Sequence, residues 1–235
     1  MNQNGETSTI MALAIFDLDN TLLGGDSDFL WGRYLCENGI VDEQAYRRAN
    51  EHYYQQYLEG CLDIYAFLEF VFKPLASHDM QTLERWREAY LEEKIKPIIL
   101  PAAEALIAKH RALGDTLLII TATNSFLTGP IAKMLGIDNL IATDPEIHDG
   151  RFTGRVAGEP AFQEGKVKRL RDWLHLHDET LAGSTFYSDS HNDLPLLELV
   201  DKPVAVDPDP KLQAVAQQRD WQILSLRQHV DASSV

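Results

Sequence analysis

The sequence predicts an α/β fold: a Rossmann-like parallel sheet with an inserted all-helical cap domain. Two almost uninterrupted apolar runs, at 12–16 and 116–121, suit strands that are buried on both faces of a parallel sheet. From residue 98 onward, strand and helix patterns alternate, as they do in βαβ units. Between residues 26 and 97 only helical patterns occur. We therefore expect a core made of residues 11–25 and 98–235, and a four-helix bundle made of residues 26–97.

Composition indicates an ordinary globular protein. The chain has 235 residues, of which 45% are hydrophobic and 24% are charged, enough for one good core and a smaller second unit. Its net charge is −15, and no basic cluster along the chain compensates for it. We therefore expect no nucleic-acid partner and no membrane partner.

The beginning of the chain and its cysteines allow three further expectations. Residues 1–10 show no hydrophobic pattern and are expected to form a flexible tail. No basic segment precedes the apolar run at 10–16, and Asp17 interrupts that run, which argues against a signal peptide and favours the cytoplasm. Cys36 and Cys61 have the spacing of neither a disulfide framework nor a metal site, so we expect buried, reduced thiols.

The insert is expected to contain four helices. Apolar residues recur at helical spacing over 27–37, and again after Asp42, Asp63 and Asp79. Each of these aspartates can cap the helix that follows it, and Pro74 is expected to end the third helix. Because the intervening loops are short, the helices should pack antiparallel into a small bundle.

The elements after residue 98 complete the sheet. We expect helices at 101–113, 126–135, 165–176 and near 211–217, and strands at 116–121, 139–143, 184–188, 203–206 and 222–226. Asp149 and Gly150 lie between alternating apolar residues, which indicates a hairpin at the margin of the sheet.

Polar residues follow three of the predicted strands. Asp17 and Asp19 end the first strand, Thr121 ends the next, and Asp189 follows the strand at 184–188. Because right-handed crossovers bring the carboxyl ends of parallel strands to one edge, these side chains should converge. Clustered carboxylates with open oxygens suit Mg²⁺, which usually takes one or two carboxylates together with waters and substrate phosphate. Calcium is disfavoured, because no loop supplies six or more oxygen ligands.

Four motifs stand in the order that is typical of the haloacid dehalogenase superfamily of phosphohydrolases, and the chain resembles that superfamily. The motifs are Asp17-x-Asp19-x-Thr21, Thr121, Lys166, and Asp189-x-x-Asn192-Asp193. The first motif alone would be weak, because two aspartates and a threonine often end a strand and cap a helix. The resemblance covers residues 11–226, and the insert looks like the cap of the phosphoserine-phosphatase-like branch.

The resemblance implies a role for each motif residue. Asp17 would be the nucleophile that forms an aspartyl-phosphate, and Asp19 the acid that protonates the leaving group and then activates water. Thr121 and Lys166 would bind the phosphoryl group, and Asn192 matches the asparagine of the last motif. The implied Mg²⁺ ligands are Asp17, the main-chain carbonyl of Asp19, and Asp189, with Asp193 in a supporting contact.

A carboxylate attacks a phosphate dianion poorly because the two charges repel each other, so the chemistry needs cations between them. One Mg²⁺ and Lys166 would cancel most of the negative charge of the four aspartates, and a protonated Asp19 would remove more. The sequence also departs from the family pattern in two places. Ser188 stands where glycine commonly precedes the last motif, and Ala122 and Thr123 stand where serine phosphatases have two glycines. These departures bear on the substrate more than on the chemistry.

Several residues near the motifs have two interpretations. Lys166 and Lys168 cannot both face the sheet edge, because two residues turn a helix by about 200°, and Lys166 matches the family pattern. Asp26 and Asp28 either cap the first helix of the insert or contact the substrate. His191 is expected at the surface, and the tyrosines of the second helix in the core of the bundle, with no part in the chemistry; these are Tyr53, Tyr54 and Tyr57.

The favoured function is a Mg²⁺-dependent phosphomonoesterase that acts on a small phosphorylated metabolite, as a monomer or homodimer. A phosphotransferase or mutase on the same scaffold and a non-catalytic phosphate-binding module remain alternatives. Asp26 and Asp28 favour an amine-bearing substrate, such as phosphoserine or histidinol phosphate. The carboxylate of phosphoserine would need a cation, for which Arg33, Arg47 and Arg48 are candidates. The imidazole of histidinol phosphate could pack against Trp31 and the tyrosines.

Overall fold

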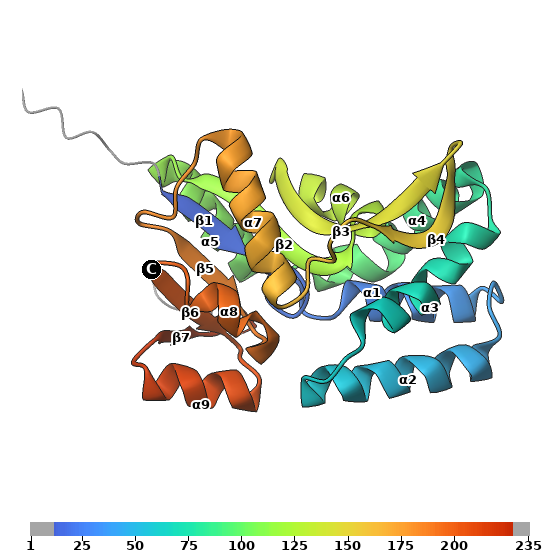
Figure 1. Cartoon of the computed structure of the whole chain (residues 1–235), viewed down its shortest axis with the longest axis horizontal. Coiled ribbons are helices and arrows are strands. Elements are labelled where there is room, and N and C mark those ends of the chain that lie inside the picture. Colours follow the sequence, from blue (N-terminus) through green and yellow to red (C-terminus); the bar gives the residue numbers. More distant parts are fainter. Residues whose placement is uncertain (1–11, 228–235) are drawn as a thin grey trace, which may run out of the picture.

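The computed structural model describes residues 12–227, and the tail predicted at 1–10 lies outside the described residues. Within them, one sheet has the strand order β4-β3-β2-β1-β5-β6-β7 (Figure 1). The strands are β1 (Leu13–Phe16), β2 (Thr116–Asn124), β3 (Asn139–His148), β4 (Arg151–Ala157), β5 (Thr185–Ser188), β6 (Lys202–Val206) and β7 (Gln222–Leu224). Neighbouring strands are parallel, except for the β3–β4 hairpin at one edge. The predicted α/β class and the marginal hairpin are confirmed.

Helices cover both faces of the sheet, which explains why the strand sequences are continuously apolar. Successive residues of a strand point to opposite faces, so Ile15 and Phe16 belong to different apolar clusters. On the Phe16 side lie α5 (Pro101–Leu113) and α6 (Ser125–Met134). On the Ile15 side lie α7 (Glu164–His177), α8 (Leu194–Leu197) and α9 (Pro210–Gln218). None of the helices in the described part of the chain has the length and apolarity needed to cross a membrane.

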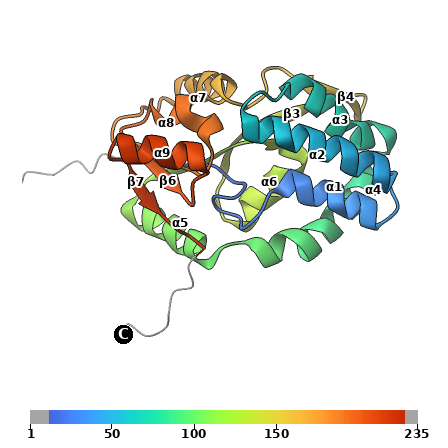
Figure 2. The same cartoon turned by 90° about the horizontal axis from the view of Figure 1, so that it is seen from below.

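Four helices follow β1 as predicted, and Figure 2 shows them together on one side of the molecule. They are α1 (Ser27–Glu37), α2 (Glu43–Glu59), α3 (Ile64–Ser77) and α4 (Met80–Tyr90). Each begins with an aspartate whose carboxylate accepts hydrogen bonds from backbone N–H groups of the first turn; the caps are Asp26, Asp42, Asp63 and Asp79. A π-helical turn (Leu91–Ile95) and a 3₁₀ turn (Lys96–Ile98) lead from α4 toward α5.

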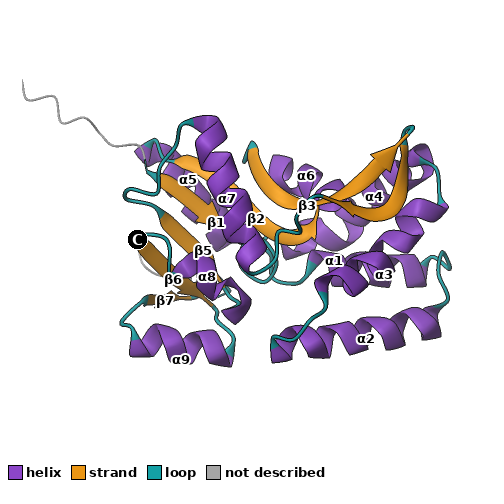
Figure 3. Cartoon of the chain, viewed as in Figure 1, coloured by secondary structure: helices purple, strands orange, loops and turns teal. Residues whose placement is uncertain are grey.

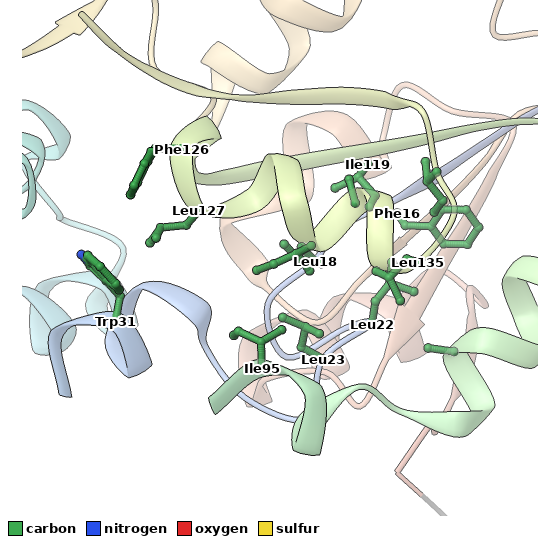
Figure 4. Close-up of a cluster of buried hydrophobic side chains, with 14 of the residues drawn as sticks. Phe16, Leu18, Leu22, Leu23, Trp31, Ile95, Ile119, Phe126, Leu127 and Leu135 are labelled. Carbon is green, nitrogen blue, oxygen red and sulfur yellow. The ribbon is translucent and has the colours of Figure 1, made fainter. Parts of the chain in front are cut away.

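The helical segment shares an apolar cluster with the sheet. Figure 4 shows Phe16 of β1 and Ile119 of β2 in the same cluster as Trp31 of α1. At the far edge of the sheet, α3 packs against β4 (Figure 3). The helices are therefore held against the same side of the sheet as α5 and α6, beside the carboxyl ends of β1 and β2.

Three predictions were wrong in detail. Pro74 does not end α3, which continues to Ser77, because the proline costs one backbone hydrogen bond while Leu75 beyond it is fully buried. The strand at 116–121 is longer than expected and runs to Asn124. The cysteines are free, but Cys61 is exposed in the loop after Gly60, which ends α2 in a left-handed conformation, and Cys36 is only partly buried.

Candidate active site

A pocket opens at the carboxyl ends of β1 and β2, between the sheet and helices α1 to α3. Its polar side is formed by Asp17 and Asp19 after β1, by residues 121–124 of β2, and by Lys166, Asn192 and Asp193. Its opposite side is formed by apolar and aromatic residues of α1, α2 and α3. The ends of β1, β2 and β5 therefore meet as the strand order requires, and a ligand placed there would contact both the sheet and the helical segment.

A tight turn after β1 gives the first motif its shape. Asn20 adopts a positive φ of 57°, a left-handed conformation that asparagine tolerates better than most residues, and its N–H donates to the carbonyl of Gly25. Leu18, between the two aspartates, and Leu22, directly after Thr21, are fully buried. These two leucines anchor the turn in the core, while Asp17 and Asp19 line the pocket.

Lys166 lies between two carboxylates at the bottom of the site. Its Nζ donates to Asp17 Oδ1 and to the carboxylate of Asp193, both at 2.8 Å, and its side chain is 4% exposed. Although burial lowers the pKa of Lys166, the two carboxylates raise it above its ordinary value, so the amine stays charged. Lys168 points to solvent with 63% of its side chain exposed and pairs with Glu159. The prediction that Lys166 rather than Lys168 faces the sheet edge is confirmed.

Asp17 carries an unusual pKa. Burial raises it to about 7, with help from the nearby negative charges of Asp193 and Asp19, and Lys166 only partly opposes this. The second oxygen of Asp17 lies 3.4 Å from Thr21 Oγ1, which is also 3.3 Å from Asp189 Oδ1. Burial likewise raises the pKa of Asp189 well above its ordinary value. The site therefore contains more buried carboxyl groups than its one lysine can keep ionised.

Asp19 is held from both sides. The backbone N–H of Ser27, at the start of α1, donates to Asp19 Oδ1 at 2.7 Å, and the hydroxyl of Thr123 donates to Asp19 Oδ2 at 2.8 Å. Burial and the neighbouring charge of Asp26 raise the pKa of Asp19 to about 6, while these two donors lower it. An acid with this pKa can give up and take back a proton near neutral pH.

Asn192 and Asp193 belong to a network that joins the last motif to α2. Asn192 donates to the carbonyl of Tyr57 at 3.3 Å, and the hydroxyl of Tyr57 donates to Ser190 at 2.9 Å. Ser188, where the family commonly has glycine, donates to Asp193 Oδ2 at 2.7 Å. Asp193 is thus engaged by Lys166 and Ser188, which leaves it suited to a supporting contact rather than to direct metal ligation.

The residues that could hold Mg²⁺ fit that ion in number and kind. Among residues 12–227, no group of three or more His, Cys, Asp or Glu side chains has an arrangement that would hold a metal by itself. Mg²⁺ needs fewer, because it commonly keeps several waters and takes one or two carboxylates. Asp17 and Asp189 approach each other around Thr21, and both have the raised pKa described above. A divalent cation beside them would stabilise their ionised forms.

Asp26 and Asp28 both lie at the pocket, and Asp26 also caps a helix. Asp26 caps α1 by accepting from Phe29 N at 2.8 Å, and it lines the pocket as well. Asp28, in the first turn of α1, lines the pocket and is buried. Burial raises the pKa of Asp28 well above its ordinary value, and the charges of Asp26 and Asp19 add to this effect. A cationic group bound in the pocket beside Asp28 would lower this pKa again and stabilise the ionised carboxylate.

The wall of the pocket contains tyrosines that the sequence placed either in the core of the bundle or against a substrate ring. Tyr53, Tyr54 and Tyr57 line it together with Phe29, Phe67 and Phe162, which the sequence did not indicate. Trp31, expected near a substrate ring, is instead buried in the core against Tyr34. The pocket-lining residues of the described chain include no arginine and only one lysine, Lys166. Two of the candidate arginines, Arg33 and Arg47, pair with glutamates on their own helices, and Arg48 is exposed.

Comparison with known proteins agrees with this geometry. The sequence model of the family described as haloacid dehalogenase-like hydrolase matches residues 14–198. The chain is 45% identical over 219 residues to a histidinol-phosphatase of Neisseria meningitidis serogroup C, a match that covers 92% of this chain and 99% of that protein. It is 32% identical over 221 residues to the phosphoserine phosphatase SerB1 of Mycobacterium tuberculosis, covering 93% of this chain and 72% of that protein.

Solved structures show the same architecture. A protein of unknown function from Bordetella pertussis Tohama I superimposes with a TM-score of 0.86 at 44% identity, covering 92% of this chain and 98% of that one. A phosphoserine phosphatase solved as an analogue of its phospho-aspartyl intermediate superimposes with a TM-score of 0.68 at 18% identity, covering 92% of this chain and 94% of that one. At that level of identity the second likeness concerns the fold.

Proposed function

Because the chain belongs to the haloacid dehalogenase-like hydrolase family and is a phosphatase, we propose that it is a Mg²⁺-dependent phosphomonoesterase that works through an aspartyl-phosphate on Asp17. The observation that carries the proposal is the placement of two carboxylates with different partners at one pocket. Asp17 is held by a buried lysine, and Asp19 is held by two hydrogen-bond donors. Such a pair suits one nucleophile and one proton-transfer group.

In the first step of the proposed reaction, an oxygen of Asp17 attacks the phosphorus atom of the substrate. The bond between phosphorus and the leaving-group oxygen breaks, and that oxygen takes the proton of Asp19. Lys166 and Thr121 would bind the phosphoryl oxygens, and Lys166 also orients Asp17 through its 2.8 Å contact. A bound Mg²⁺, held by Asp17, Asp189 and the main-chain carbonyl of Asp19, would offset the repulsion between carboxylate and phosphate.

In the second step, water attacks the phosphorus atom of the aspartyl-phosphate, and the bond between Asp17 and phosphorus breaks. Asp19, now ionised, takes a proton from the attacking water, which returns both aspartates to their starting state. The pKa of Asp19, raised to about 6, supports both directions of proton transfer near neutral pH. Residues 26–97, whose helices α1 to α3 line the pocket opposite the strand ends, would act as a lid that keeps bulk water away from the first step.

The proposed substrate is a small phosphomonoester that carries an amine and a ring but no carboxylate, and histidinol phosphate meets this description. Asp28 offers a buried carboxylate for a cationic group, and the aromatic side chains of the wall offer surfaces for a ring. The carboxylate of phosphoserine would be repelled by Asp26 and Asp28, and the described residues that line the pocket include no arginine to pair with it. The 45% identity to a histidinol-phosphatase supports this choice.

The substrate proposal is tested by measuring kcat/KM for three compounds: histidinol phosphate, phosphoserine, and an aryl phosphate whose aryl group is uncharged. Each is measured with the wild-type enzyme, Asp28→Asn and Asp26→Asn. Asparagine caps helices about as well as aspartate, so Asp26→Asn separates the charge of Asp26 from its role as the cap of α1. We expect Asp28→Asn to lower kcat/KM for histidinol phosphate by about tenfold or more, because one charge-assisted contact is lost. The kcat/KM for the aryl phosphate should change little. Equal losses on both compounds would reduce Asp28 to a structural residue.

A further inference from the structure

Thr123 makes two contacts that connect different parts of the proposed chemistry. Its hydroxyl donates to Asp19 Oδ2 at 2.8 Å, across 104 positions in the sequence. Its backbone N–H donates to Thr121 Oγ1 at 3.2 Å, and Thr121 is buried at the bottom of the pocket. One residue thus joins the proposed phosphoryl-binding threonine to the proposed acid.

The surrounding chain fixes the position of Thr123. The pairing of β2 with β3 changes register between Ile120 and Asn124, so Thr123 lies in an irregular segment at the end of the strand. Directly after it, Asn124 caps α6 by accepting from Leu127 N at 3.2 Å, and this asparagine is buried. Thr123 is therefore held between a central strand and a capped helix, which gives its hydroxyl a defined direction.

We propose that Thr123 is a positioning residue for Asp19, and this inference rests on the proposed function. The N–H of Ser27 can only donate, and it occupies Oδ1. A threonine hydroxyl can both donate and accept, so its contact with Oδ2 persists whether Asp19 is ionised or protonated. Thr123 thereby holds the proton-transfer group in one orientation through both steps of the reaction, where a pair of glycines would leave Oδ2 without this side-chain contact.

Phosphomonoesters with different leaving groups should respond differently to the loss of the Thr123 hydroxyl. An alkyl leaving group departs as a strong base and needs the proton of Asp19, whereas a nitrophenolate leaves without protonation. Loss of a correctly placed acid typically costs about 10²- to 10⁴-fold, and loss of its orientation alone should cost less. We therefore expect Thr123→Val to lower kcat for an alkyl phosphomonoester by about 10- to 100-fold, with KM little changed. For p-nitrophenyl phosphate the first step should be nearly unaffected.

The experiment measures kcat and KM on a primary alkyl phosphomonoester, and the single-turnover rate of nitrophenolate release from p-nitrophenyl phosphate. Thr123→Ser keeps the hydroxyl and should restore the alkyl activity to within about threefold of wild type. Thr128→Val is the matched control, because Thr128 is a buried threonine nearby whose hydroxyl donates only to the carbonyl of Asn124. Its alkyl activity should stay at the wild-type level.

Each outcome separates this inference from the proposed function. Equal losses of Thr123→Val on both substrates, or wild-type activity of this variant on the alkyl substrate, would overturn the positioning role while leaving the phosphatase mechanism in place. Failure of Thr123→Ser to recover activity would also overturn it. If the wild-type enzyme hydrolysed neither compound in the presence of Mg²⁺, the proposed function itself would be wrong.

Discussion

Replacing Lys166 by methionine removes the one buried cation among the described residues that line the pocket. Methionine keeps most of the volume, but Asp17 and Asp193, both less than 10% exposed, lose a partner at 2.8 Å. Removing one member of a buried ion pair costs about 3–5 kcal/mol in the free energy of unfolding. For a chain of this size that corresponds to a fall in Tm of roughly 6–20 °C.

The matched control is Lys168→Met, which removes a lysine two positions away that is 63% exposed and pairs with Glu159. An exposed pair of this kind contributes at most about 1 kcal/mol. Both variants are compared with the wild type by thermal and urea unfolding in the presence of EDTA, because bound metal would add stability by mass action. Equal destabilisation of the two variants would refute the account of Lys166 as the counter-charge of the site.

The pH dependence of this deficit follows from Asp17. Its folded pKa is raised to about 7, so its ionisation opposes folding, and the loss of Lys166 would raise that pKa further. Well below pH 7 Asp17 is largely protonated in both folded proteins, and its contribution to their difference in stability becomes small. Above pH 7 the Asp17 carboxylate is ionised in the wild type, and in the variant it lacks the positive charge of Lys166 that stabilises it. The deficit of Lys166→Met should therefore be larger at pH 8 than at pH 5.5, and an unchanged deficit would contradict the assignment to Asp17.

Three further predictions concern the site and its scaffold. Asp17→Asn should abolish phosphate release while retaining cooperative unfolding by circular dichroism, and an active variant would exclude the covalent route. EDTA should eliminate turnover and added Mg²⁺ should restore it, whereas full activity in chelator would contradict the need for a metal. Gly165→Ala should lower the free energy of unfolding by about 1–3 kcal/mol, because a Cβ there would overlap the carbonyl oxygen of Pro160. It should also lower phosphatase activity, since the first turn of α7 carries Lys166. Urea unfolding and a phosphatase assay measure the two effects, and wild-type values in both would contradict the prediction.

The fold could be predicted wherever a local pattern has one physical meaning. The run ending at Phe16 is apolar throughout because both faces of β1 are covered, and Asp42 and Gly60 mark the two ends of α2 by their caps. The prediction that Pro74 ends α3 was wrong because burial of this helix outweighs the local cost of the proline. A short stretch of sequence does not show that burial.

The candidate site was predictable to the extent that strand ends converge. Lys166 could be chosen over Lys168 because a helix has one inward face. The contact between Thr123 and Asp19 could not be derived in the same way, because it depends on a change of register in β2 and on the course of a turn 104 positions earlier. The sequence contained two signals: Thr123 stands where serine phosphatases have glycine, and its two-residue spacing from Thr121 would place both side chains on one face of a regular strand. For Tyr57, no local pattern distinguishes the pocket wall from the core of a bundle.

The central claim is tested most directly by locating the phosphoryl group during turnover. Asp19→Asn retains the nucleophile but lacks the base of the second step, so with p-nitrophenyl phosphate and Mg²⁺ it should release nitrophenolate and then accumulate phosphoenzyme. Acid quenching and mass spectrometry of the peptides should find one phosphoryl group, on Asp17. Continued hydrolysis by this variant with no phosphoryl group on Asp17 would contradict the account.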